Sequence, residues 1–207
     1  MPASASNWNL VIVGAWNRAI LTPDGIRRRL LELPDGTPIE VEIPLDILAP
    51  FRVRHEGVTI IPSERGLELS VASPGTDQLA LAVTYASRAL SCLPETPVSA
   101  AGVNLRYRVT GDLTSLHRLV DAEINNIISD QGFAITASET KRTLSFEPGT
   151  LNLQIAQDPA GECAVRFNFH RDSNRPEELA TWLERHVEFI NCSERILRSL
   201  NLEIEES

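Results

Sequence analysis

The chain has 207 residues, of which 43% are hydrophobic and 23% are charged. These values are ordinary for a globular protein, and a chain of this length can bury a sizeable core without disulfides or metals. The net charge of −9 argues against non-specific nucleic-acid binding by the whole surface, because such binding depends on positive charge. No run approaches the ~20 apolar residues of a membrane-spanning helix and no leader pattern is visible, so we expect a cytoplasmic protein without membrane contact.

The cysteines argue against two kinds of small scaffold. Cys92, Cys163 and Cys192 are odd in number and far apart in the sequence. A disulfide framework or a zinc site needs cysteines paired at close, regular spacing. The cysteines therefore predict neither a disulfide framework nor a zinc site, and the sequence as a whole leads us to expect no metal and no cofactor.

The first half of the chain predicts a strand, a helix, several short strands and a second helix. Trp8–Trp16 is apolar on both faces, as in a strand that is covered on both sides. Thr22, Pro23 and Asp24 are typical of a helix start, and we expect this helix to span Pro23–Leu33. The later elements are extended segments at Pro38–Ile43, Phe51–Arg54, Val58–Pro62 and Gly66–Ala72, and a helix that follows Ser73–Asp77 and ends near Cys92.

The second half repeats this order. Val98–Val109 alternates as a strand from Val103 onward, and a helix is expected from about Thr114 to Ser129. The later elements are extended segments at Phe133–Ala137, Thr140–Glu147, Thr150–Gln157 and Glu162–His170, and a last helix over Pro176–Leu202. We therefore predict an α+β protein of two similar halves, residues 1–96 and 97–207, that share one largely antiparallel sheet backed by helices. The repeated order allows an internal duplication, although amphipathic helices also resemble one another by their shared apolar spacing.

This order of elements resembles that of the TATA-box-binding protein family, in which two such units form one curved sheet backed by helices. The resemblance is one of topology, covers nearly the whole chain and implies a shared fold. That family wedges paired phenylalanines from its sheet into DNA, whereas the outward positions inferred here hold none. Together with the acidic net charge, this means that the resemblance does not imply DNA binding.

Alternation within the strands of the second half predicts a polar, basic sheet face. Val103, Leu105 and Tyr107 point one way, towards the helices, and the residues between them point away. The candidate ligand-binding residues on the outward face are Asn104, Arg106, Arg108, Lys141, Asn152, Gln154, Arg166, Asn168 and His170. This face is suited to a phosphate-bearing ligand, a nucleic-acid strand or an acidic partner, although single-strand binding usually needs outward aromatic rings. The equivalent face of the first half is more acidic, so the two faces of two copies could also meet; a third interpretation is the ordinary solvated side of a sheet.

The last predicted helix carries a second apolar side. Trp182, Phe189 and Ile196 widen the stripe that faces the sheet. Such a side covers either the rest of the chain or a second copy, and we take these three residues as candidates for a homodimer interface.

Catalytic motifs are not found. His117 and Asp121 lie four apart on a predicted helix, which suits two metal ligands, but no third ligand is adjacent in sequence. Nucleophile-elbow and phosphate-loop patterns are absent, so we assign no catalytic residue. The first hypothesis is a non-enzymatic binding or assembly protein that self-associates or binds a protein partner. The second is a module for anionic ligands, including nucleic acid, and the third is an enzyme with a site assembled around His170 or His117.

Overall fold

The computed structural model describes residues 1–46, 49–110, 123–157 and 163–205. Its strands are β1 (Pro2–Gly14), β2 (Glu40–Glu42), β3 (Arg52–His55), β4 (Val58–Pro62), β5 (Gly66–Val71), β6 (Val98–Val109), β7 (Ser138–Phe146), β8 (Gly149–Gln157), β9 (Cys163–Asp172) and β10 (Glu203–Ile204). Its helices are α1 (Pro23–Arg29), α2 (Thr76–Cys92), α4 (Glu123–Asp130), α5 (Pro176–Glu184) and α6 (His186–Ser199).

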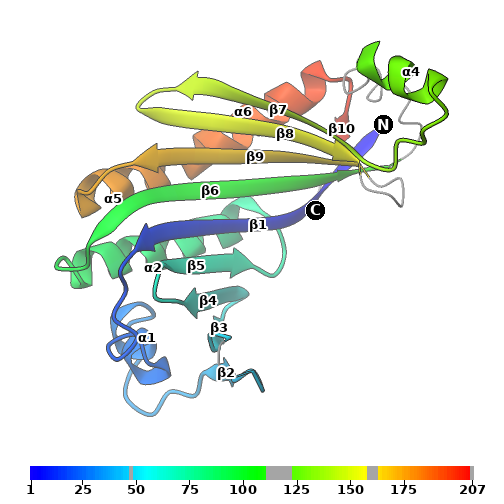
Figure 1. Cartoon of the computed structure of the whole chain (residues 1–207). Coiled ribbons are helices and arrows are strands. Elements are labelled where there is room, and N and C mark those ends of the chain that lie inside the picture. Colours follow the sequence, from blue (N-terminus) through cyan, green and yellow to red (C-terminus); the bar gives the residue numbers. More distant parts are fainter. Residues whose placement is uncertain (47–48, 111–122, 158–162, 206–207) are drawn as a thin grey trace.

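Within these residues the strands form a single ten-stranded sheet in the order β2-β3-β4-β5-β1-β6-β9-β8-β7, with β10 beside the start of β1 (Figure 1). Every pairing is antiparallel except that of β1 with β10. β1 and β6 begin the two halves and lie side by side, and the remaining strands of each half, apart from β10, extend outward from them. The predicted α+β class, with a largely antiparallel sheet, is confirmed; an internal duplication stays a prediction.

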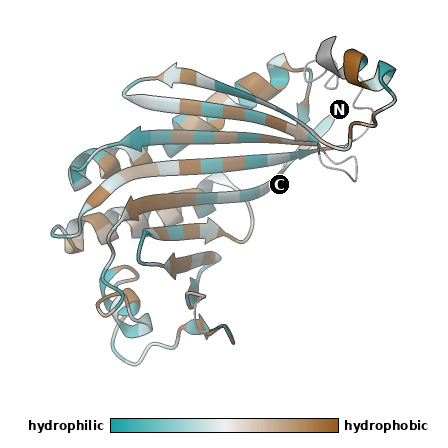
Figure 2. Cartoon of the chain, in the orientation of Figure 1, coloured by the Kyte–Doolittle hydropathy of each residue, from teal (hydrophilic) through white to brown (hydrophobic). Residues whose placement is uncertain are grey.

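Helices α2, α5 and α6 back one face of the sheet. α2 packs against β1, β4 and β5, and α5 and α6 pack against β6. Brown and teal residues alternate along the long strands in Figure 2, as expected for a sheet with one covered face. Val103, Leu105 and Tyr107 are 0–1% exposed, which confirms the predicted inward set on β6. On β7, however, Leu144 is 39% exposed, because this strand lies at the edge of the sheet and is only partly covered.

Several boundaries differ from prediction. β1 begins at Pro2 rather than near Trp8, because β6 supplies hydrogen-bonding partners from Val109 onward to this polar stretch. α1 ends at Arg29 rather than at the predicted Leu33. Glu32, within the predicted helix, has a left-handed φ of 55°, which is incompatible with a continued helix. The Thr22 cap is confirmed: its hydroxyl accepts a hydrogen bond from the Gly25 N–H at 3.1 Å.

Two predicted elements of the second half are also altered. α4 is the C-terminal part of the helix predicted to end at Ser129, and the start of that helix lies outside the described residues. Phe133–Ala137 forms no strand. The second half therefore contributes β6 to β10 to the sheet, whereas β1 to β5 come from the first half.

The last helix is broken at Arg185, whose ψ of 11° lies outside helical values. The Arg185 guanidinium lies 4.9 Å from the centre of the Phe146 ring and donates a hydrogen bond to the Glu147 carbonyl oxygen at 2.7 Å. Neither glycine nor proline occurs at this break, and the contacts of Arg185 with the end of β7 account for it. α6 ends at Ser199, short of the predicted end at Leu202, and after a turn the chain adds β10 to the sheet.

The second apolar side of this helix pair is used within the chain. Trp182 is 1% exposed and Phe189 is 0% exposed. The Phe189 ring stacks on Phe169 with centroids 4.5 Å apart, and it also contacts Phe146. Ile196 is partly buried against the same core. The expectation that Trp182 and Phe189 offer a surface to a second copy is therefore corrected: both already contact their own sheet.

No helix in the described part of the chain has the length and apolar character needed to span a membrane.

Candidate ligand-binding face

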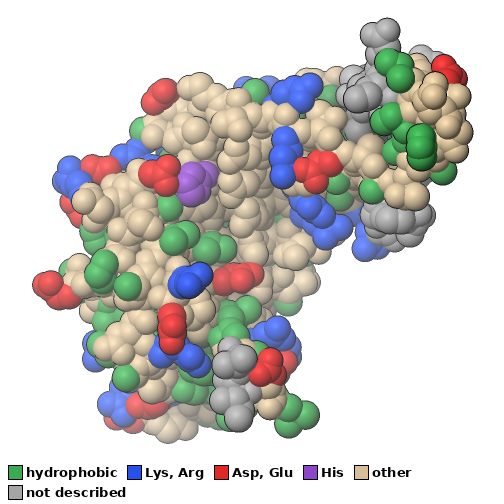
Figure 3. All heavy atoms as spheres, viewed as in Figure 1, with side chains coloured by type: hydrophobic (Ala, Val, Ile, Leu, Met, Phe, Trp, Pro, Cys, Tyr) green, Lys and Arg blue, Asp and Glu red, His purple; other side chains and the backbone are tan. Residues whose placement is uncertain are grey.

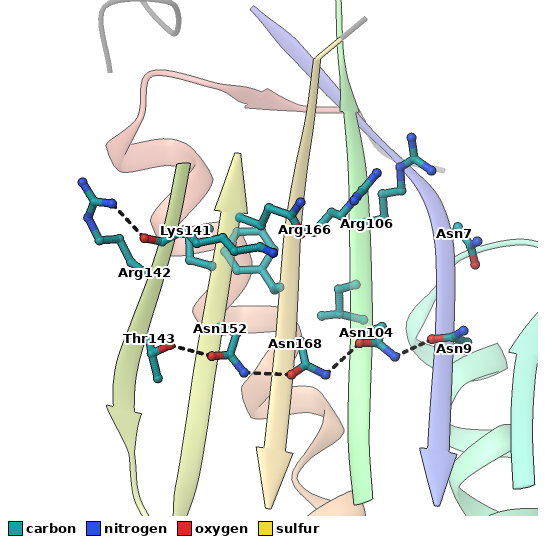
Figure 4. Close-up of a pocket in the computed structure, with 14 residues that line it drawn as sticks. Asn7, Asn9, Asn104, Arg106, Lys141, Arg142, Thr143, Asn152, Arg166 and Asn168 are labelled. Atoms are coloured by element: carbon teal, nitrogen blue, oxygen red, sulfur yellow. Dashed lines mark hydrogen bonds between the residues drawn. The ribbon is translucent and has the colours of Figure 1, made fainter. Parts of the chain in front are cut away.

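The face of the sheet opposite the helices carries a hollow of about 550 Å³ over the second half. Residues of β1, β6, β7, β8 and β9 line it (Figure 4). Seven of the nine predicted ligand-binding residues are among them: Asn104, Arg106, Lys141, Asn152, Gln154, Arg166 and Asn168. Period-two alternation therefore placed these seven side chains together on one face, because neighbouring strands in register bring their outward residues together.

A row of primary amides forms the floor of the hollow. Four asparagines are register neighbours on adjacent strands, and we call them the amide ladder: Asn9 on β1, Asn104 on β6, Asn168 on β9 and Asn152 on β8. Hydrogen bonds run, from donor to acceptor, from Thr143 to Asn152 (2.8 Å), to Asn168 (3.0 Å), to Asn104 (2.8 Å), to Asn9 (2.8 Å) and to Glu68 (2.7 Å). Figure 4 shows the first four of these bonds as one continuous line across the strands.

All bonds of the ladder run in the same sense. The carboxylate of Glu68 only accepts, so Asn9 must turn its amide nitrogen towards it and its oxygen towards Asn104. Each later amide repeats this orientation as far as the hydroxyl of Thr143. A primary amide has two N–H groups and the ladder uses one, which leaves a second N–H on each half-buried amide for the hollow.

Two arginines face each other in the next row of the sheet. Arg106 on β6 and Arg166 on β9 are direct register partners, and we call them the arginine pair. Side chains in this relation have Cβ atoms about 5 Å apart, and like charges there are destabilising. The Nε of Arg106 is buried without a hydrogen-bond partner, and among the described residues neither guanidinium lies within ion-pair distance of a carboxylate, although the charge of Arg166 contributes to the lowered pKa of Glu139. The pair thus concentrates positive charge at one side of the hollow.

The same row continues to a lysine whose charge is balanced. Gln154 lies opposite Arg166, and Lys141 lies opposite Gln154. Lys141 forms a 2.8 Å ion pair with Glu139, and this hydrogen bond is the main reason that the pKa of Glu139 is below its usual value. Lys and Arg side chains gather beside a largely uncharged stretch of this face in Figure 3.

The arginines of the first half differ from the arginine pair. Arg54 forms ion pairs with Glu40 at 2.9 Å and with Glu42 at 2.8 Å, and Arg52 pairs with Glu42 at 3.1 Å. The sequence predicted a more acidic face on the first half and a basic face on the second. In the structure, the arginines of the first-half face are neutralised by neighbouring glutamates, whereas the arginine pair of the second half forms no ion pair among the described residues.

Two of the predicted residues lie elsewhere. Arg108 and His170 do not line the hollow. His170 lies on the other side of the ladder, with its Nε2 atom 3.0 Å from a carboxylate oxygen of Asp172. His117 and Asp121 lie outside the described residues, and in the described part of the chain no three His, Cys, Asp or Glu side chains form a metal-binding group.

Sequence reasoning assigned no role to four lining residues, Asn7, Asn9, Arg142 and Thr143. Alternation with the buried Trp8 and Leu10 would have placed the two asparagines on the outer face. No local signal gives the register that puts Asn9 beside Asn104.

No protein-family model matches this sequence, and no curated protein is significantly similar to it.

Proposed function

We propose that this protein binds anionic ligands in the hollow on the second half of its sheet. The observation that carries the proposal is the arginine pair, two guanidiniums on directly opposed positions beside a row of outward amide N–H groups. The groups that face the hollow are mainly hydrogen-bond donors. A ligand that fits them is rich in acceptors and negatively charged at the arginine pair.

The energetics favour an oxyanion over an empty site. Placing two guanidiniums opposite each other costs the free protein about 0.2–1 kcal/mol, and an anion between them removes this repulsion. A guanidinium offers parallel N–H groups that match the oxygens of a phosphate or carboxylate. A volume of about 550 Å³ is within the range of small-molecule sites.

Other expectations from the sequence are less well supported. Self-association was argued from the second apolar side of the last helix, and Trp182 and Phe189 are already buried there. Nucleic-acid binding lacks an outward aromatic ring in the hollow, since the side chain of Phe167 is 1% exposed and points inward. Self-association, a protein partner and a fold like that of the TATA-box-binding protein stay predictions.

The direct test is titration calorimetry with inorganic phosphate, sulfate and citrate at low ionic strength. We expect saturable binding of at least one of these anions, and a loss of about tenfold or more in affinity for Arg106→Gln or Arg166→Gln, because charge-assisted hydrogen bonds contribute about 1.5–3 kcal/mol each. Arg198→Gln is the matched control, because this arginine pairs with Glu194 on α6, behind the sheet. Binding that survives replacement of both members of the arginine pair, or is lost equally in the control, would contradict the proposal.

A second readout uses stability without ligand. Because the arginine pair is repulsive, Arg106→Gln should leave unfolding in anion-free buffer unchanged or shifted upward by about 1–3 °C, whereas saturating anion should stabilise only the unaltered protein. A large loss of stability in anion-free buffer would mean that Arg106 has a structural role.

A further inference from the structure

We infer that the anion bound here is a phosphorylated polyol, such as a sugar phosphate, with its phosphate on the arginine pair and its hydroxyl groups on the amide ladder. This inference rests on the proposed function and adds the chemistry of the uncharged part of the ligand. It follows from the two parallel rows of the hollow, one charged and one neutral.

The two rows have a fixed separation. Asn104 and Arg106 are two residues apart on β6, as are Arg166 and Asn168 on β9. Two residues of an antiparallel strand span about 7 Å. A phosphate held by the arginine pair therefore leaves the next few atoms of a compact ligand over the amides.

The amide ladder matches hydroxyl groups. Each ladder amide keeps one free N–H and one free lone pair on its oxygen, because its other groups are used along the ladder. A hydroxyl group both donates and accepts, so it can use both remaining positions. A second phosphate or carboxylate finds no cation in this row, and it would approach Glu68, the carboxylate at the end of the ladder.

Aromatic and apolar ligands fit the hollow less well. The aromatic side chains of the strands beneath the hollow are buried on the side of the helices: Phe167 and Tyr107 are each 1% exposed, and Trp8 is 4% exposed. A nucleobase would therefore lie on amides without an aromatic ring to stack on. An acyl chain would bury amide N–H groups that have no hydrogen-bond partner, which is unfavourable.

Glu68 sets the orientation of the amides before any ligand arrives. It accepts from Asn9 at 2.7 Å and thereby fixes the direction of each bond back to Thr143. Groups that are already oriented lose little conformational freedom on binding, which favours affinity. Glu68 is thus a positioning residue, which acts on the ligand through the ladder.

The test compares inorganic phosphate, glucose 6-phosphate and glucose by titration calorimetry on the full chain. We expect glucose 6-phosphate to bind at least tenfold more tightly than phosphate, because several neutral hydrogen bonds are added. Asn104→Leu should weaken glucose 6-phosphate about tenfold and change phosphate binding by less than about threefold, since it removes hydrogen bonds from the sugar alone. Asn191→Leu, at an exposed position of α6, is the matched control and should change neither.

Glu68→Gln supplies a second variant in case Asn104→Leu does not fold. Its amide can turn either way, so the ladder loses its fixed sense, and we expect weaker glucose 6-phosphate binding with unchanged phosphate binding. The inference is overturned if phosphate and glucose 6-phosphate bind equally tightly, or if hexaglutamate or a short oligothymidylate competes more strongly than the sugar phosphate. Those results leave the proposed function intact, whereas the absence of any anion binding that depends on Arg106 would remove both.

Discussion

Replacing Phe189 by alanine should cost about 4 kcal/mol of unfolding free energy. The side chain is 0% exposed, stacks on Phe169 at 4.5 Å with an interplanar angle of 12°, and lies 4.8 Å from the Trp182 ring. A buried Phe→Ala replacement costs about 3–5 kcal/mol through lost transfer energy and the cavity left behind. For a chain of this size the loss corresponds to a fall of roughly 10 °C in the thermal midpoint. Urea unfolding followed by circular dichroism measures it.

The control for this variant is Val187→Ala on the same helix, at a position that is 46% exposed, which should cost less than about 1 kcal/mol. The loss at Phe189 should not depend on protein concentration, because the contacts that are removed lie within one chain. If Phe189 lay instead between two copies, the midpoint would rise with concentration and the variant would be a folded monomer. That result would refute the assignment of this ring to the core.

Three further changes test local features. Thr22→Ala should lower the unfolding free energy by about 1 kcal/mol through loss of the α1 cap, measured by urea unfolding. Arg185→Met should lower stability and reduce the helical circular dichroism signal little, because it removes the hydrogen bond to the end of β7 and the contacts with aromatic rings while α5 and α6 remain. The pKa values of Asp24 and Asp35 are lowered chiefly by hydrogen bonds from Arg27, so their stabilisation is present above the unfolded value of 3.8 and is lost as pH falls through the folded value. Between about pH 5 and about pH 2, the unfolding free energy of Asp35→Asn should therefore fall less than that of the unaltered protein. An equal fall in urea unfolding experiments would contradict this linkage.

The sheet face was predictable because it depends on a local pattern. Val103, Leu105 and Tyr107 are buried in alternation with Asn104 and Arg106, and backbone geometry alone converts such a pattern into two faces. β4 and β5 were predicted as the extended segments Val58–Pro62 and Gly66–Ala72 because clear turn residues flank them.

Features that depend on register or on distant partners were not predictable. The alignment of Asn9 with Asn104 joins residues 95 positions apart, and period-two patterning fixes a side but gives no register. The early start of β1 likewise depends on pairing with the end of β6, and the addition of β10 depends on pairing between the two ends of the chain. The break at Arg185 follows from contacts with Phe146 and Glu147, which override good helix propensity.

Nuclear magnetic resonance of the two guanidiniums tests the central claim most directly. On titration with inorganic phosphate, the Nε–Hε signals of Arg106 and Arg166 should shift together along one saturable curve, with the backbone amides of residues 104–106 and 166–168. The signal of Arg198, on α6, should stay unchanged at matched ionic strength. Guanidinium signals of the arginine pair that do not move, or that move linearly with phosphate concentration without saturating, would contradict an anion site on this face.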